Sequence, residues 1–493
     1  MEGPLAHTLY GTVKGTQANG VNIWRGIPFA TPPIGELRFQ APQPPIPWNY
    51  VKEAVEFGPV SHQPADTKGT RFGRKQPVHS EDCLYLNVWS PTGSQEALPV
   101  MVWIHGGTFV TGSGSQPMFD GTSLSSRGNV IVVSINYRLG PFGFLHLSPW
   151  GKGFASNQGL LDQIAGLEWV RDNIAAFGGN PDRVTVFGES AGSMSIAALL
   201  AMPAAKGLFS SAIMQSGTSQ TLHPKQAEEI TAAWLSELGI KPDGDLSRLT
   251  SLSAESIMEA AGRMTLKLSG DSLSMFFQPV VDGKTLPEEP SKAIAKGAAK
   301  GIPLLIGTNR DEGNLFFREG TSAVNFEQSL RALEMLMGGQ NLSEIARHYP
   351  ASWEGQADIL TDLYFWRSSV SFAEEQRDHG PVWMYRFDWA LPGHPLLHKA
   401  VHGAEIVFAF NNLFLLRHLG IEVTASMNRL AEVMQGAWIA FAHRRDPSTP
   451  EMQWPEYRRG DRATLILDEH TRVLHDPERE KRKRLILNRG GSL

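Results

Sequence analysis

The sequence predicts an α/β protein with a central, mostly parallel, twisted sheet, an N-terminal β-hairpin and helical insertions that cap the sheet. From Leu84 onward, short apolar runs alternate with stretches of helical periodicity, the pattern of strands separated by helices. At the N-terminus, two β-rich runs flank an Asn-Gly pair. The 49 glycines and 32 prolines supply the many turns that such a fold needs.

The two N-terminal runs are Tyr10–Thr16 and Val21–Gly26, and Ala18-Asn19-Gly20 separates them. Asn-Gly suits a two-residue turn because both of its residues tolerate positive φ. We therefore expect these runs to pair as a hairpin.

Seven later runs are short, apolar and bounded by turn signals, so we expect them to be strands. They are Leu84–Trp89, Val100–Ile104, Val130–Ile135, Val184–Phe187, Ala212–Gln215, Leu304–Gly307 and Val382–Phe387. Between the third and the fourth run, apolar residues from Leu161 to Ile174 keep near-helical spacing. Two strands joined by a helix form a βαβ unit, for which we expect parallel pairing.

Two helix-rich stretches, about residues 221–275 and 320–380, interrupt the strand rhythm. No Ser/Gly linker flanks either stretch, so we expect cap insertions within a single domain that spans residues 1–493.

The charge balance argues against some classes of partner. The chain has 45 Lys and Arg against 50 Asp and Glu, a formal charge of −5, whereas nucleic-acid and anionic-membrane binders need a basic field.

The N-terminus lacks the features of a secretory signal, and no apolar run approaches the roughly 18 residues of a spanning helix. A single cysteine, Cys83, excludes an intrachain disulfide. We expect a cytoplasmic monomer that binds neither nucleic acid nor membrane.

The motif Gly188-Glu189-Ser190-Ala191-Gly192 carries the clearest chemical signal. It follows the predicted strand Val184–Phe187 and leads into a helical run, which is the context of a nucleophile elbow. In such a tight turn, only small residues fit two before and two after the serine. The turn exposes the serine hydroxyl and points the helix N-terminus at developing negative charge. This context favours a nucleophilic Ser190 over a plain surface turn.

A serine nucleophile needs a base, and the base needs an orienting acid; in elbow enzymes the acid and the histidine follow the serine in the chain. Asp311 and Glu312 stand in a polar loop after a buried-looking strand, and spacing alone leaves both open. His402 precedes Gly403, which lets backbone and substrate approach, but residue type alone does not select it. Nine histidines follow Glu312: His348, His379, His394, His398, His402, His418, His443, His470 and His475.

The run Trp103-Ile104-His105-Gly106-Gly107-Thr108-Phe109 ends a predicted strand in a glycine-rich loop. Elbow enzymes keep oxyanion-binding amides in such a loop, although a plain strand exit has the same composition.

His398 and His402 have the i, i+4 spacing of a zinc helix. The glutamate of H-E-x-x-H is missing, and Pro395 and Gly403 limit any helix there. We therefore expect no metal and no cofactor.

Three motifs together give the chain a resemblance to type B carboxylesterases, the carboxylesterase/cholinesterase group of the α/β-hydrolase fold. They are Phe177–Pro181 running into Gly188–Gly192, Glu81–Asn87, and Asn136–Gly140. The resemblance extends from Gly26 to Pro455. It implies a serine carboxylic-ester hydrolase that forms an acyl-enzyme from small to medium esters, such as para-nitrobenzyl or para-nitrophenyl esters. A non-catalytic adhesion or scaffold role is the alternative class.

The resemblance also implies roles for individual residues. The acid is then Glu312 rather than Asp311, and the base is His402. Oxyanion amides come from Gly107, Thr108 and Ala191, and Thr108 stands where many relatives carry glycine or alanine, so its branched side chain narrows the acyl or alcohol space.

Three further expectations complete the prediction. The resemblance implies that Arg38–Glu81 and Arg138–Asp162 form structural ion pairs. It also implies that Cys83 is free, because secreted relatives pair this cysteine with an upstream one and this chain has His62 near that place. Glu189 should point away from the nucleophile and act only electrostatically. Pocket walls, for which plain core is the alternative, are Phe109, Met194, Leu315, Phe316 and Phe365.

Overall fold

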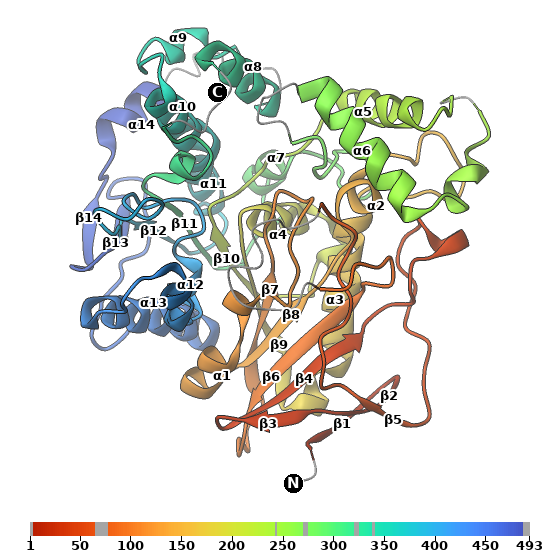
Figure 1. The fold of residues 1–493 in the computed structure, drawn as a ribbon. Helices are drawn as coiled ribbons and strands as arrows, with labels where there is room; N and C mark the ends of the chain where they lie inside the picture. Colours follow the sequence, from red (N-terminus) through yellow and green to blue (C-terminus); the bar gives the residue numbers. More distant parts are fainter. Residues whose placement is uncertain are drawn as a thin grey trace.

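The computed structural model describes residues 3–64, 77–241, 244–269, 275–319, 325–337 and 341–486, and its centre is a mixed sheet of 11 strands (Figure 1). In order across the sheet these are β14 (Arg472–His475), β13 (Ala463–Leu467), β12 (Val382–Phe387), β11 (Leu304–Asn309), β10 (Ser211–Gln215), β9 (Gly179–Glu189), β7 (Leu98–Ile104), β8 (Ile131–Ile135), β6 (Tyr85–Pro91), β4 (Val21–Pro28) and β3 (Thr16–Ala18). From β13 to β8 all neighbours run parallel, and antiparallel strands extend both edges. The predicted fold class is confirmed.

All seven strands predicted from apolar runs are present, but β13 and β14 are missing from the prediction. β13 is a short apolar run between charged residues, and β14 is an edge strand without buried residues. Turn signals do flank these strands, Gly460-Asp461 before β13 and Asp476-Pro477 after β14, so β13 can be recognised in the sequence, whereas β14 lacks an apolar run.

The N-terminal hairpin is confirmed, with a different first strand. β3 and β4 pair across Asn19 and Gly20, whose φ values of 53° and 75° make a turn in which both residues are left-handed. Most of the predicted first run instead forms β2 (Gly11–Lys14), which joins β1 (Leu5–Thr8) and β5 (Val51–Glu53) in a separate sheet. The chain passes between the sheets at Gly15, where a Cβ would lie 2.4 Å from the carbonyl oxygen of Ile23.

The expected pairing of β8 with β9 is wrong. Helix α3 (Gln158–Asn173) connects them, but both strands are parallel to β7, which lies between them. After β7 the chain forms β8 on one side of that strand, and then crosses through α3 to form β9 on its other side. Such a switch point opens a crevice at the carboxyl ends of the strands, here β7 and β9.

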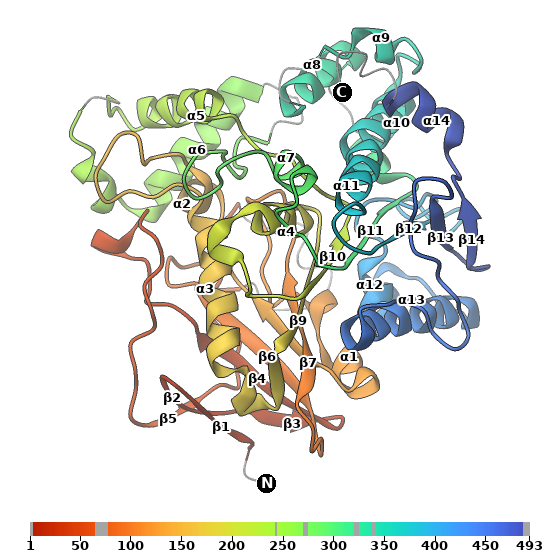
Figure 2. The ribbon, with the colours of Figure 1, turned by 180° about the vertical axis from the view of Figure 1, so that it is seen from behind.

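Helices cover both faces of the sheet because side chains along each strand alternate between two apolar clusters. In β7, Val100, Val102 and Ile104 belong to one cluster, and Met101 and Trp103 belong to the other. The first face is covered by α3, α4 (Ala191–Ala201), α7 (Pro290–Ala295) and α11 (Ser368–Gln376), as Figure 2 shows for α3 and α4. The second is covered by α1 (Thr122–Gly128), α12 (Ile406–Ala409) and α13 (Ala425–Arg444).

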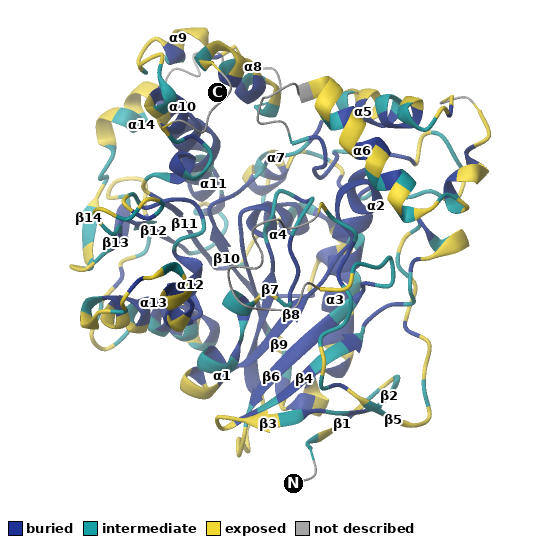
Figure 3. Ribbon diagram, viewed as in Figure 1, coloured by how far each residue is buried: buried dark blue, intermediate teal, exposed yellow. Residues whose placement is uncertain are grey.

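The two predicted helical stretches lie beside one end of the sheet, at the upper right and upper left of Figure 1. The first holds α5 (Pro224–Glu237) and α6 (Ala254–Ser269); the second holds α8 (Phe326–Leu336), α9 (Ser343–Ala346), α10 (Trp353–Leu360), the π-helical turn Thr361–Arg367 and α11. Figure 3 shows that their outer surfaces are exposed, whereas the central strands are buried. Residues 242–243, 270–274, 320–324 and 338–340 of these stretches lie outside the described residues.

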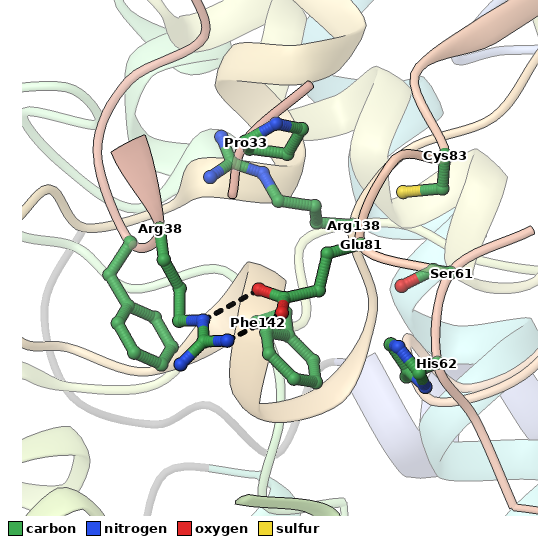
Figure 4. Close-up of a pocket in the computed structure, with 9 residues that line it drawn as sticks. Pro33, Arg38, Ser61, His62, Glu81, Cys83, Arg138 and Phe142 are labelled. Carbon is green, nitrogen blue, oxygen red and sulfur yellow. Dashed lines mark hydrogen bonds and ion pairs between the residues drawn. The ribbon is translucent and has the colours of Figure 1, made fainter. Parts of the chain in front are cut away.

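Both predicted ion pairs are confirmed. Arg38 donates to both oxygens of Glu81 at 2.6 Å (Figure 4), and Arg138 donates to both oxygens of Asp162 at 2.8 and 2.7 Å. Cys83, which lies near the first pair, is a free, fully buried thiol whose pKa is raised by burial. Within the described ranges, no helix is long and apolar enough to cross a bilayer.

The pair Arg138–Asp162 predicts a large stability effect. Asp162 also accepts the backbone N–H of Arg138, and both side chains are almost fully buried. Asp162→Ala leaves a buried guanidinium without its partner, so we expect a loss of about 3–5 kcal/mol. Urea unfolding followed by fluorescence measures it. The exposed pair Arg171–Asp172 supplies the control, because Asp172→Ala should leave the midpoint nearly unchanged; equal midpoints for the two variants would contradict the prediction.

Candidate active site

Ser190 lies in the turn between β9 and α4, with φ 56° and ψ −122°. This left-handed backbone is held by a hydrogen bond from the Ser190 amide to the carbonyl oxygen of Gln215 on β10 (2.8 Å). The turn presses against β7: a Cβ on Gly188 or Gly192 would lie 2.6 or 2.0 Å from the carbonyl oxygen of Ile104. The requirement for small residues on both sides of the serine therefore comes from close packing against the neighbouring strand.

Glu312 and His402, 90 residues apart in the chain, meet beside this turn. Glu312 follows β11 in the short helical turn Glu312–Leu315, and its Oε2 lies 2.6 Å from Nδ1 of His402. Its Oε1 accepts the backbone N–H of Asn309 at 2.7 Å, so both carboxylate oxygens are engaged although the side chain is fully buried. This contact fixes the orientation of the imidazole ring.

Asp311 points elsewhere. Its Oδ2 accepts the backbone N–H of Ala400 at 3.1 Å, and its own N–H donates to the carbonyl oxygen of Ala400 at 3.0 Å. Asp311 therefore holds the segment that leads into His402 and makes no contact with the ring itself.

Glu189 corrects a prediction, because its side chain turns toward the site. Its Oε1 lies 3.1 Å from Nε2 of His402. Phe187, two residues earlier on β9, packs in the cluster under α12 and α13, and strand alternation sends Glu189 to the same face. The chain after His402 lies on that face: a Cβ on Gly403 would be 3.5 Å from Glu189 Oε1.

A buried polar network behind the ring was missing from the sequence prediction. Fully buried Glu405 accepts hydrogen bonds from the side-chain amides of Gln215 (3.1 Å) and Asn309 (2.6 Å), and Gln215 accepts one from the indole of Trp438 (3.0 Å). Only the position of Glu405 three residues after His402 hints at this network in the sequence.

Three carboxylates thus surround one imidazole. Burial opposes the imidazolium, but the negative charges of Glu189, Glu312 and Glu405 outweigh it and raise the pKa of His402 to about 9. Burial raises the pKa of Glu189 to about 8, opposed by the positive charge of His402. Glu405 also has a raised pKa, mainly because it is buried. The buried pair of His402 and Glu189 therefore retains a proton at neutral pH, shared between the two side chains.

The loop after β7 lies against the serine. A Cβ on Gly106 would be 3.0 Å from that of Ser190. Gly107, Thr108 and Phe109 all have positive φ (115°, 54° and 61°), which costs about 1–2 kcal/mol at a residue with a side chain. Among the described residues, the backbone N–H groups of Gly107, Thr108 and Ala191 have no hydrogen-bond partner. These amides remain available to an oxygen beside Ser190.

The five predicted wall residues divide into two groups. The rings of Phe365 and Phe316 lie 4.8 and 5.4 Å from that of His402, and the sulfur of Met194 lies 3.9 Å from the hydroxyl of Tyr364. Leu315 and Phe109 pack into the core, Leu315 partly buried and Phe109 fully buried 4.7 Å from the ring of Phe144. Met194 and Phe365 also belong to the buried core, so all five assignments to the pocket wall stay predictions.

His398 is exposed and its Nδ1 lies 3.2 Å from the carbonyl oxygen of His394; no helix carries it together with His402. In the part of the chain that the structure describes, no group of three or more His, Cys, Asp or Glu side chains is arranged to hold a metal ion.

Comparison with known proteins decides the family. The sequence model of the carboxylesterase family matches residues 2–485. The chain belongs to the carboxylesterase family. It is 51% identical to the para-nitrobenzyl esterase of Bacillus subtilis (strain 168), over 98% of both chains, and 34% identical to the phenmedipham hydrolase of Pseudarthrobacter oxydans, over 96% of this chain and 97% of that protein.

Solved structures agree with this assignment. A thermophilic PNB esterase matches with a TM-score of 0.93 at 51% identity, covering 98% of this chain and 99% of that one. A carboxylesterase of Geobacillus stearothermophilus matches with a TM-score of 0.86 at 38% identity and the same coverage. This carboxylesterase thus has the α/β-hydrolase fold and hydrolyses carboxylic esters.

The carboxylate cluster predicts an unusual pH dependence. Because the raised pKa keeps His402 protonated to higher pH, and only neutral imidazole can accept a proton, kcat/KM should rise with pH along a limb centred above pH 7. Glu189→Gln removes one of the raising charges and should move this limb down by about 1 pH unit or more. Profiles of kcat/KM against pH with a para-nitrophenyl ester measure the position of the limb in the unmodified enzyme and in Glu189→Gln. Glu53→Gln on distant β5 is the control, in which the limb should stay in place. A limb that stays in place in Glu189→Gln would contradict the prediction.

The two neighbouring acids should differ strongly. Glu312→Gln removes the charge that orients His402, so we expect kcat to fall by about 10³–10⁴ with the fold retained. Asp311→Asn keeps an oxygen acceptor for the Ala400 amide, so its loss should be far smaller. Steady-state kinetics and circular dichroism on both variants provide the measurement. An inactive Asp311→Asn beside an active Glu312→Gln would reverse the assignment.

Proposed function

We propose that this carboxylesterase cleaves small to medium carboxylic esters through a covalent acyl-enzyme, with Ser190 as nucleophile, His402 as base and Glu312 as orienting acid. The observation that carries the proposal is the 2.6 Å contact between Glu312 and His402 Nδ1 beside the strained turn of Ser190. It leaves Nε2 of His402 as the nitrogen that exchanges protons.

In the first half-reaction, Ser190 Oγ attacks the ester carbonyl while His402 Nε2 takes the hydroxyl proton. The amides of Gly107, Thr108 and Ala191 donate to the oxyanion of the tetrahedral intermediate. Glu312 and Glu189 stabilise the imidazolium, which then protonates the departing alcohol. Water resolves the acyl-enzyme by the same proton route in reverse.

Substrate preference follows from the relatives and from the apolar side chains beside the base. Para-nitrobenzyl and para-nitrophenyl esters suit a site in which Phe316, Phe365 and Met194 lie near His402 and Ser190. The methyl and hydroxyl of Thr108 restrict the space next to the oxyanion. Amides, carbamates and thioesters form the same tetrahedral intermediate, so each class is to be tested beside esters.

We further infer a cytoplasmic, monomeric enzyme with one domain over residues 1–493. A single family match over residues 2–485 supports one domain. The proposed triad and oxyanion amides all come from one chain, so the chemistry requires no second copy. The single, free cysteine suits a reducing compartment.

Pre-steady-state kinetics test the acyl-enzyme. Mixing with a para-nitrophenyl ester should release a burst of nitrophenol equal to the enzyme concentration when deacylation is slower than acylation, and Ser190→Ala should lose the burst and nearly all turnover. Esters of increasing acyl length then locate the upper size limit. Ser193→Ala, one turn away and hydrogen-bonded to the carbonyl oxygen of Gly217, is a control that should keep the burst. Full turnover in Ser190→Ala would overturn the proposal.

A further inference from the structure

The oxyanion loop, residues 105–112, needs support from outside itself. Thr108 and Phe109 adopt left-handed backbone although neither is glycine. Such conformations persist only where surrounding contacts hold them. Phe109 is held from one side, because its carbonyl oxygen accepts the N–H of Gly140 at 2.7 Å and its ring is buried against Phe144.

On the other side, Gln63 binds the end of the loop. Its Oε1 accepts the N–H of Gly112 at 2.8 Å, and its Nε2 donates to the carbonyl oxygen of Gly112 at 3.1 Å and to that of Ser61 at 3.1 Å. The side-chain amide thus pairs with both backbone groups of one residue, as a neighbouring β-strand would. This pairing fixes Gly112 in position and in rotation.

Gly112 is closely coupled to the proposed oxyanion amides. The carbonyl oxygen of Gly107 accepts the N–H groups of Val110 and Thr111 (3.0 and 2.9 Å), and a Cβ on Gly107 would lie 2.2 Å from the carbonyl oxygen of Thr111. A Cβ on Gly112 would in turn lie 2.6 Å from the carbonyl oxygen of Gly106. The loop is therefore one closed unit, and a shift of Gly112 moves Gly107 and Thr108.

The segment that carries Gln63 is itself well anchored. Val60 exchanges backbone hydrogen bonds with Val78 and Ser80 (both 2.9 Å), and Ser61 Oγ accepts the N–H of Leu139 at 3.0 Å. Gln63 therefore connects a rigid segment to the loop.

We propose that Gln63 is a positioning residue for ester hydrolysis, whose side-chain amide holds the oxyanion loop in the strained conformation that aims the amides of Gly107 and Thr108 at the developing oxyanion. This inference rests on the proposed function, since it requires Ser190 as nucleophile and these amides as oxyanion donors. Gln63 acts through the loop and touches no reacting atom.

The experiment compares Gln63→Met, which keeps the chain length and removes the amide, with Gln63→Glu, which keeps an acceptor for the Gly112 N–H and places a carboxylate against two carbonyl oxygens. Loss of a single oxyanion donor typically lowers kcat by 10²–10³, so partial misplacement of two should lower it by about 10–100-fold with KM nearly unchanged. A readout specific to the oxyanion is the inhibition constant of a trifluoromethyl ketone. Ser190 adds to its carbonyl while His402 takes the proton, and the resulting oxyanion has no leaving group to expel. This constant should rise by the same factor.

Gln376→Met is the matched control. Gln376, unlike the half-buried Gln63, is fully buried, but its Nε2 also bridges two backbone carbonyl oxygens, those of Ala299 and Ile302 (3.0 and 2.8 Å), and it lies on α11. Its loss should lower the melting temperature without changing kcat or ketone binding. If kcat and ketone binding in both Gln63 variants equal those of Gln376→Met, the inference is overturned.

Two further arms keep the test decisive. Should Gln63→Met fail to fold, Gln63→Glu carries the comparison alone. Ser190→Ala separates the two claims: retained activity there overturns the proposed function and this inference together, whereas an inactive Ser190→Ala beside normal Gln63 variants overturns this inference only.

Discussion

The contact between Glu312 and His402 is the interaction on which the rest of the site depends. A carboxylate with no exposed surface is costly unless its oxygens are hydrogen-bonded, and both oxygens of Glu312 are engaged, one by His402 and one by the amide of Asn309. Because one of these partners belongs to β11 and the other to a loop 90 residues later, the contact exists only when the sheet is complete. Assembly of the site therefore requires the tertiary fold.

The surrounding carboxylates determine what that contact can do. Glu189 lies on the far nitrogen of the ring and Glu405 lies behind it, held by Gln215 and Asn309. Together they favour a positive charge on the ring, which the proposed transfer of the Ser190 proton creates. The same charges retain a proton on the resting ring, so they favour the intermediate and disfavour the free base at neutral pH.

Strain and support occur together around Ser190. The serine, Thr108 and Phe109 all have positive φ, and each is held by contacts from neighbouring strands or loops: Gln215 on β10, Gly140, and Gln63 through Gly112. The close approach of β7 and β9 at the switch point creates this crowding, since glycines are required wherever one backbone passes another. The parallel sheet thus supplies both the position of the proposed nucleophile, Ser190, and the rigidity that keeps its turn strained.

Local sequence alone determined seven strands of the large sheet, the elbow around Ser190 and the glycine-rich loop, because each depends on neighbouring residues: apolar runs between turn signals, and small residues where a strand turns into a helix. The choice of Glu312 over Asp311, and of His402 among nine histidines, came from family resemblance, and spacing did not supply it. Only the tertiary structure decided that β7 separates β8 from β9, that Glu189 faces His402, and that Glu405 and Gln63 support the site. Each of these depends on which distant segment lies opposite a side chain, and that is set by the packing of the whole sheet.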